Sequence, residues 1–190
     1  MMAMVKKFGM TRVQLTSLLL FLANLAACQG FGQPQTVGVG AHVVNTVPNT
    51  TIVSVRYNGQ GVSSGGGEGC CVSLPAKWQP GMVATVEWVK DPSPGVNPGG
   101  VKPPARNTNG SSTPEWEKWM DIHEANYTRH SVTIPAPSYG ETCGLALVFL
   151  PCGEVRPVID CKEHSRVFGG NAMKPEIMRR LGGKNTCPKS

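Results

Sequence analysis

The side chains best suited to chemistry in this 190-residue chain are its seven cysteines. A thiol can form a disulfide, bind a metal or carry a covalent lipid. Zinc is disfavoured because no two cysteines have the Cys-x-x-Cys spacing of common zinc sites. In an oxidising compartment an odd number of cysteines requires one thiol with another fate, and Cys28 is the candidate. The others can form up to three disulfides in any of fifteen connectivities, and they are Cys70, Cys71, Cys143, Cys152, Cys161 and Cys187.

Cys70 and Cys71 are adjacent, at the start of an apolar run that ends at Pro75. Neighbouring side chains on a strand point to opposite faces, so we do not expect these two thiols to bond to each other. We expect them to tie their strand to two different partners. Each disulfide would add about 2–4 kcal/mol to the free energy of unfolding.

The first 27 residues indicate a cleaved secretion signal. Lys6, Lys7 and Arg12 make a positive segment, and an apolar run from Leu15 to Ala23 follows it. The run is shorter than the roughly 20 apolar residues that a bilayer-spanning helix needs. Charge, apolar run and the small residues at its end are together typical of a signal peptide.

The end of this segment, Leu25-Ala26-Ala27-Cys28, resembles the lipobox of bacterial lipoproteins. The resemblance implies diacylglycerol on the Cys28 thiol, cleavage before that residue and acylation of the new amine, so that palmitate-like chains anchor the protein. Gln29 in second place, where Asp would favour inner-membrane retention, favours an outer-membrane lipoprotein facing the periplasm. Residues 28–36 would be a lipidated tether. The alternative is an ordinary secretion signal, with Cys28 as a plain thiol.

Composition and charge exclude some classes of protein. Removal of the signal leaves 15 Lys and Arg against 12 Asp and Glu, a surplus too small and scattered to predict nucleic-acid binding. The chain has 23 glycines and 16 prolines, which argues against a helical bundle and favours strands and turns.

Residues 37–190 are expected to form a single β-rich domain. Apolar and polar residues alternate from Met82 to Val89, and Asn58-Gly59 is typical of a tight hairpin turn. Residues 91–114 are rich in proline and glycine, which predicts a long exposed loop. With six or seven short strands and one or two short helices, the fold class is all-β, an antiparallel β-sandwich stapled by disulfides. Further strands are expected at 37–41, 52–57, 131–135, 145–150 and 155–159, and a helix at 173–181.

The sequence shows no catalytic motif. It lacks a Gly-x-Ser-x-Gly elbow, a paired-histidine metal motif and a Walker loop, and its four histidines lie far apart. The glycine-rich stretch 65–69 contains Glu68, whose negative charge opposes phosphate binding. Trp78 and Trp88 are expected in the core. We therefore predict no enzyme activity, no catalytic residue, no metal and no cofactor beyond the lipid on Cys28.

The run from Gly65 to Gly81, with Cys-Cys-Val-Ser-Leu-Pro at its centre, resembles a family of small bacterial lipoproteins of unknown function. Some members are encoded beside phospholipase effectors of type VI secretion and act as their periplasmic immunity proteins. The resemblance covers roughly residues 37–160, and the chain departs from it at 91–114 and after Cys161. It implies a membrane-anchored inhibitor whose partner is a secreted lipase effector.

Protein–protein contacts of such an inhibitor are expected in exposed loops, where binding specificity varies. A structural or accessory envelope lipoprotein without inhibitor activity is the alternative, and the loops would then only connect strands. Residues 115–123 are left open between helix and strand: Thr113-Pro114 suits a helix start, whereas the family pattern makes the later part extended. The candidate partner-binding residues are Gly65, Gly66, Gly67, Glu68, Gly69 and Trp116.

Overall fold

The computed structural model describes residues 35–62, 69–184 and Cys187. All the strands and helices described below belong to one compact unit that begins at Thr36. Among the described residues, no helix is both long and apolar enough to cross a membrane.

Several predicted features lie outside the described residues. These are the signal at 1–27, the lipid-bearing Cys28, nearly all of the tether at 28–36, and the loop residues Gly65 to Glu68.

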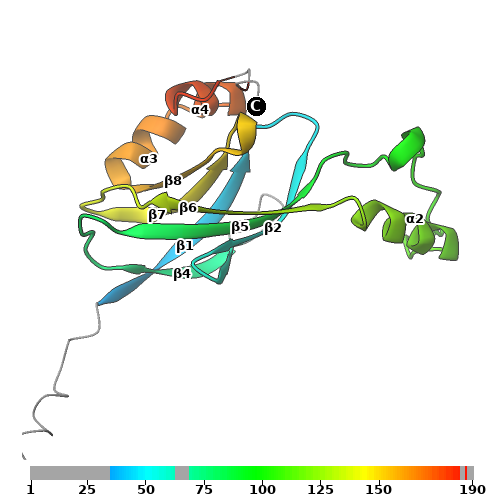
Figure 1. The fold of residues 1–190 in the computed structure, drawn as a ribbon, viewed down its shortest axis with the longest axis horizontal. Coiled ribbons are helices and arrows are strands. Elements are labelled where there is room, and N and C mark those ends of the chain that lie inside the picture. The colour runs from blue at the N-terminus through cyan, green and yellow to red at the C-terminus, as the bar shows by residue number, and fades with distance from the viewer. Residues whose placement is uncertain (1–34, 63–68, 185–186, 188–190) are drawn as a thin grey trace, which may run out of the picture. The chain divides into compact units, whose positions relative to one another are not determined.

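Eight strands in the described part of the chain form two four-stranded sheets (Figure 1). The order is β4-β1-β7-β8 in the first sheet and β3-β2-β5-β6 in the second sheet. This arrangement confirms the predicted β-sandwich. The strands are β1 (Thr36–Asn45), β2 (Thr51–Tyr57), β3 (Gln60–Val62), β4 (Gly69–Pro75), β5 (Val83–Asp91), β6 (Thr128–Pro135), β7 (Thr142–Phe149) and β8 (Val155–Asp160).

One strand pair departs from the antiparallel pattern that the sequence predicts. β1 and β7 run parallel, with Ala41 opposite Leu145 and Asn45 opposite Phe149. A parallel pair needs a long crossover connection, and the whole second sheet lies between these two strands in the sequence. No local pattern reports such a pairing.

The main core lies between the two sheets and is built by alternation along the strands. In β5, Ala84, Val86 and Trp88 are buried, whereas Val83 is 60% exposed. The alternation predicted for this segment is therefore confirmed. The Asn58-Gly59 hairpin between β2 and β3 is also confirmed, and both of its residues have the positive φ that such a turn requires, 49° and 75°.

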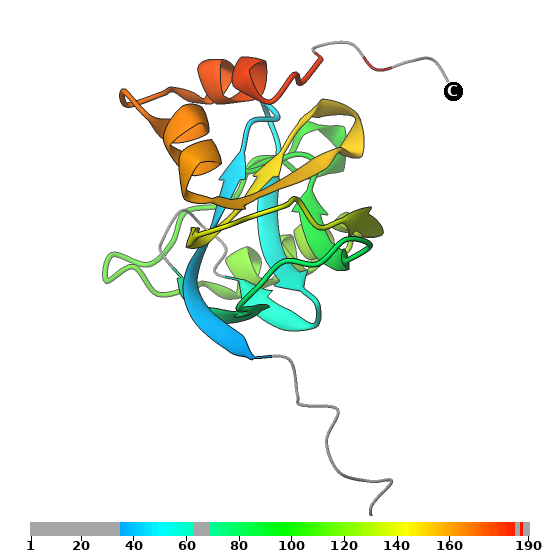
Figure 2. The ribbon, with the colours of Figure 1, turned by 90° about the vertical axis from the view of Figure 1, so that its left-hand side faces the viewer.

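Two helices cover the outer face of the first sheet (Figures 1 and 2). They are α3 (Cys161–Phe168) and α4 (Lys174–Arg180). Val167 and Ile177 pack with Ala146 and Val148 of β7 in a second buried cluster, so β7 is buried on both faces. This explains its continuous apolar sequence. The helix predicted at 173–181 is confirmed, and α3 was not anticipated.

Two disulfides join cysteines of the C-terminal third of the chain. Cys143 at the start of β7 bonds to Cys161 at the start of α3, and Cys152 bonds to Cys187. Two of the up to three disulfides predicted from the cysteine count are thus present among the described residues. The expectation that Cys70 and Cys71 are each tied to one of these four is wrong, because the four bond to each other.

Candidate functional site

The segment between β5 and β6, residues 92–127, projects from the sandwich, and we call it the arm. It contains a short 3-10 helix, η1 (Pro98–Gly100), and the helix α2 (Pro114–Glu124). Figure 1 shows that it extends from one end of the second sheet, away from the other strands. The Pro- and Gly-rich residues 91–114, predicted as a long exposed loop, thus comprise the last residue of β5 and the part of the arm up to the start of α2.

α2 decides the question that the sequence leaves open for residues 115–123. The Thr113 hydroxyl oxygen accepts a hydrogen bond from the Trp116 backbone N–H at 3.1 Å, and Pro114 occupies the first turn. Glu115 and Glu117 lie in the same turn, where negative charge stabilises a helix. The stretch is a helix, and the extended interpretation of its later part is wrong.

Three buried polar side chains connect the arm to the end of β5. Asp91, Asn97 and His123 are each at most 5% exposed. The His123 ring lies between the other two: its Nε2 is 3.1 Å from Oδ2 of Asp91, and its Nδ1 is 2.9 Å from Oδ1 of Asn97. We call these residues the buried triad.

The orientation of the Asn97 amide determines which of its atoms faces the His123 ring. The Asn97 side-chain N–H donates to the Trp119 carbonyl at 2.9 Å, so Oδ1 is the atom that faces His123. The carboxylate of Asp91 is also an acceptor. Both ring nitrogens of His123 therefore face hydrogen-bond acceptors of the protein itself.

A histidine held in this way is not placed to act as a general base. General-base catalysis needs a ring nitrogen within hydrogen-bond reach of a nucleophile or substrate. Both nitrogens of His123 instead contact buried acceptors of the protein itself. The buried triad is a structural anchor for the arm. Among the described residues there is also no group of three or more His, Cys, Asp or Glu side chains suited to a metal ion.

Aromatic side chains complete the small core of the arm. Trp119 stacks on His123 with ring centroids 4.5 Å apart and donates from Nε1 to the Val101 carbonyl at 3.1 Å. Trp116, predicted to bind a partner, is half-buried, and the Arg106 guanidinium lies 4.1 Å from its ring centre. Trp116 therefore packs within the arm, at its surface.

The surface of the arm combines negative charge with exposed apolar side chains. Ile122 is 49% exposed on α2, and Val101, which directly follows η1, is 55% exposed. Large apolar side chains exposed among charged ones are typical of a contact surface. The charged residues of α2 are four acids and one lysine, namely Glu115, Glu117, Asp121, Glu124 and Lys118.

The other predicted partner-binding residues belong to the glycine-rich stretch 65–69. Gly69 opens β4, whereas Gly65 to Glu68 lie outside the described residues. No sequence pattern singled out Asp91, Asn97 and His123. The i, i+4 spacing of Trp119 and His123 would have placed both side chains on one helix face, which is the available signal.

These features define a disulfide-bonded β-sandwich protein with a helical arm between two strands of one sheet. The chain belongs to the family described as protein of unknown function DUF3304, whose model matches residues 41–157. That match includes strands of both sheets and the whole arm. No curated protein and no solved structure was found to match the chain.

Proposed function

We propose that the mature chain is a membrane-anchored periplasmic binding protein, and that it neutralises a type VI secretion phospholipase effector by direct contact. The observation that supports this most is the arm: a helix with exposed Ile122 is held by a buried triad that joins the arm to the end of β5. A preorganised projection loses little conformational freedom on binding, which favours affinity.

The hydrogen bonding of His123 also supports binding rather than turnover. Its two ring nitrogens contact Asp91 and Asn97, which are buried side chains of the protein itself. An inhibitor acts by occupation, so it needs no general base. An interface of ordinary size, about 1,600 Å² in total, could be formed by the arm together with neighbouring loops.

The sequence supports the location. A signal peptide followed by Leu25-Ala26-Ala27-Cys28 would leave lipid on the first residue of the mature chain. An anchored inhibitor stays at high local concentration beside the membrane that a phospholipase attacks. Two disulfides suit an oxidising compartment.

Periplasmic co-expression tests the proposal. The proposal requires a phospholipase effector gene beside the gene of this chain, and finding none would count against it. That effector is secreted to the periplasm of a test strain together with the wild-type chain, with the Ile122→Asp variant or with the Met173→Asp variant. Met173 is 75% exposed at the start of α4, outside the arm, so its variant is the matched control. We expect growth with the wild type and the control, and lysis with Ile122→Asp. Lysis with all three chains at equal abundance would refute the immunity function.

A further inference from the structure

Each sheet of the sandwich has two edge strands, and three of the four are protected against pairing with another chain. β3 has only three residues. In β4, the Gln60 side chain occupies the edge: its amide donates to the Ser73 carbonyl at 3.1 Å and accepts from the Ser73 N–H at 2.8 Å. β8 contains Pro157, which has no N–H to offer.

β6 is the remaining edge strand, with eight residues and hydrogen bonds to β5 alone in the sheet. Its proline, Pro135, is its last residue, whereas Pro157 lies inside β8, so the residues of β6 before Pro135 keep their N–H groups. The side that faces β5 can be deduced from the register. The Ala136 N–H donates to the Met82 carbonyl at 2.9 Å, directly beyond the β5–β6 ladder. Since alternate residues face the same side, Ile134 and Val132 also direct their backbone groups toward β5.

The intervening residues face the other way. Thr85, which lies opposite Thr133, exchanges its backbone hydrogen bonds with Asn58 on the β2 side, at 2.8 Å in both directions. In an antiparallel pair of this kind, the opposing residue directs its N–H and C=O away from its neighbour. Thr133 and, two residues earlier, Ser131 therefore present unpaired backbone groups to the outside of the sheet, as far as the described residues extend.

A groove of about 960 Å³ runs along this edge, between β6 and β8. Its apolar lining includes alternate residues of β6, which also pack against the main core. An added strand would place every second side chain in this groove, because side chains alternate between faces. The apolar residues of the lining include Val132, Ile134, Ala136, Val155, Pro157 and Leu181.

The charges at the rim of the groove neutralise one another. Arg156 is paired with Glu154, and Arg166 is paired with Glu163. These pairs leave no net charge to attract a strongly acidic or basic segment.

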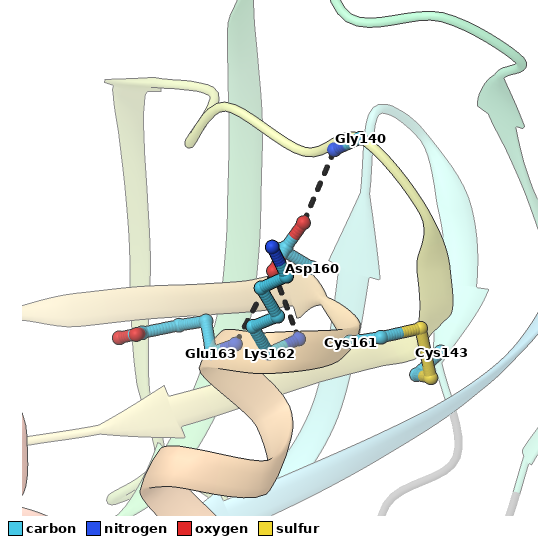
Figure 3. The surroundings of a disulfide bond; sticks show 6 residues. All are labelled: Gly140, Cys143, Asp160, Cys161, Lys162 and Glu163. Carbon is cyan, nitrogen blue, oxygen red and sulfur yellow. Dashed lines mark hydrogen bonds between the residues drawn. A yellow bond between two sulfur atoms is a disulfide. The ribbon is translucent and has the colours of Figure 1, made fainter.

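The third acidic residue of the rim, Asp160, accepts hydrogen bonds from backbone N–H groups (Figure 3). The Asp160 carboxylate accepts hydrogen bonds from the N–H groups of Gly140 at 3.1 Å, Lys162 at 2.9 Å and Glu163 at 3.3 Å. It caps α3 and holds the groove wall, next to the Cys143–Cys161 disulfide. With Lys162 as the third cation, the rim has three charges of each sign.

We propose that the β6 edge and this groove bind an extended, uncharged segment of a partner protein as an added strand, with an apolar side chain at every second position. Addition of a strand supplies main-chain hydrogen bonds, and the groove supplies selectivity. This inference does not depend on the proposed immunity function, because it concerns a different surface from the arm.

A second copy of the chain fits the groove less well. If two copies paired through β6, the inward side chains of each strand, Val132 and Ile134, would remain packed on their own core. The two grooves would then stay empty. A separate segment brings its own side chains to fill the space.

A synthetic peptide tests the proposal on the secreted chain carrying Cys28→Ser, so that it stays in solution. The probe is an eight-residue peptide of alternating threonine and valine with blocked ends, and the control peptide groups the four valines together. Amide hydrogen exchange is followed by NMR. We expect the alternating peptide to slow exchange at Ser131 and Thr133, and the grouped peptide to bind at least about tenfold more weakly, since its apolar side chains cannot all face the groove.

Thr133→Pro removes an outward N–H and leaves the ladder to β5 intact, whereas Thr133→Val keeps that N–H. We expect at least about tenfold weaker peptide binding for the first variant and little change for the second. If Thr133→Pro lowers the melting temperature, the variant Ser138→Trp is used in its place. Ser138 is exposed and lines the groove, so a tryptophan there would fill the groove and should weaken peptide binding similarly.

Several results would overturn the proposal. These are unchanged exchange at Ser131 and Thr133, equal binding of both peptides, or equal binding by the groove-filled variant. A concentration-dependent dimer that Thr133→Pro abolishes would also overturn it, by assigning the edge to a second copy.

Discussion

The Nε2 atom of His123 lies 3.1 Å from Oδ2 of Asp91, across 32 residues of sequence. Asp91 ends β5 and His123 lies in the last turn of α2, so this contact joins the arm to the sandwich. Because the opposite ring nitrogen contacts Asn97, the ring is held from both sides. The contacts of His123 with Asp91 and Asn97 therefore hold α2 against the end of β5 and the start of the arm.

The buried triad should be strongly coupled. His123→Leu leaves the Asp91 carboxylate buried without its partner, and we expect a loss of about 3 kcal/mol or more in the free energy of unfolding. Adding Asp91→Leu should recover part of that loss, because the uncompensated charge is removed. Urea unfolding of both single variants and the double variant measures the coupling. Strict additivity of the two effects would show that the two side chains do not act as a pair.

The two disulfides should contribute by different amounts. Peptide mapping should find Cys143–Cys161 and Cys152–Cys187, which close loops with sequence separations of 18 and 35. Replacing both cysteines of a pair by serine should lower the free energy of unfolding by about 3 kcal/mol for the first and slightly more for the second. Denaturant unfolding without reductant measures both. A different pairing in the map would refute the described connectivity.

Glu176 should titrate in strong acid. Hydrogen bonds from Arg179 and then Arg180 lower the pKa of its carboxyl from 4.5 to about 2. The depressed pKa means that its contribution to stability is fully present above pH 4.5 and is lost as the pH falls toward 2. NMR titration of the carboxyl carbon measures the pKa directly, and Glu176→Gln should flatten the pH dependence of stability in this window. A midpoint near 4.5 in the folded chain would contradict the ion pairs.

A glycine of β7 should tolerate no side chain. Gly144 has a φ of +116°, and a Cβ there would lie 3.0 Å from the Gly40 carbonyl oxygen of β1. Gly144→Ala should therefore lower the free energy of unfolding by about 2 kcal/mol. Gly140→Ala is the control, because its Cβ would meet open space. Equal melting temperatures for the two variants would show that the β1–β7 approach is looser than described.

Local patterns predicted the elements whose burial follows from short-range alternation. β5 was found because its apolar alternation is clear, α4 because Pro175 lies in its first turn and Gly182-Gly183 follow it, and the hairpin at Asn58 because its turn chemistry is specific. The parallel β1–β7 pair was missed since it joins distant strands. α3 was missed because its sequence, from Cys161 to Phe168, contains few apolar residues and its burial depends on β7 and β8.

The candidate site was less predictable than the fold. Trp116 and the Pro- and Gly-rich segment both lie in the arm, but neither indicated that its residues pack around a buried triad. The order comes from His123, whose two partners lie 26 and 32 residues away in sequence. No local rule connects such residues. The β6 edge also depends on which strands pair, which only the three-dimensional arrangement reveals.

The binding role of the arm is tested most directly by calorimetric titration of the phospholipase effector that the proposal requires with the soluble chain carrying Cys28→Ser. We expect a one-to-one complex, and a loss of affinity of about tenfold or more when Ile122→Asp puts a charge on the arm, with Met173→Asp unchanged. Tight binding that Ile122→Asp leaves unaltered, or no heat of binding with the wild type, would contradict this role.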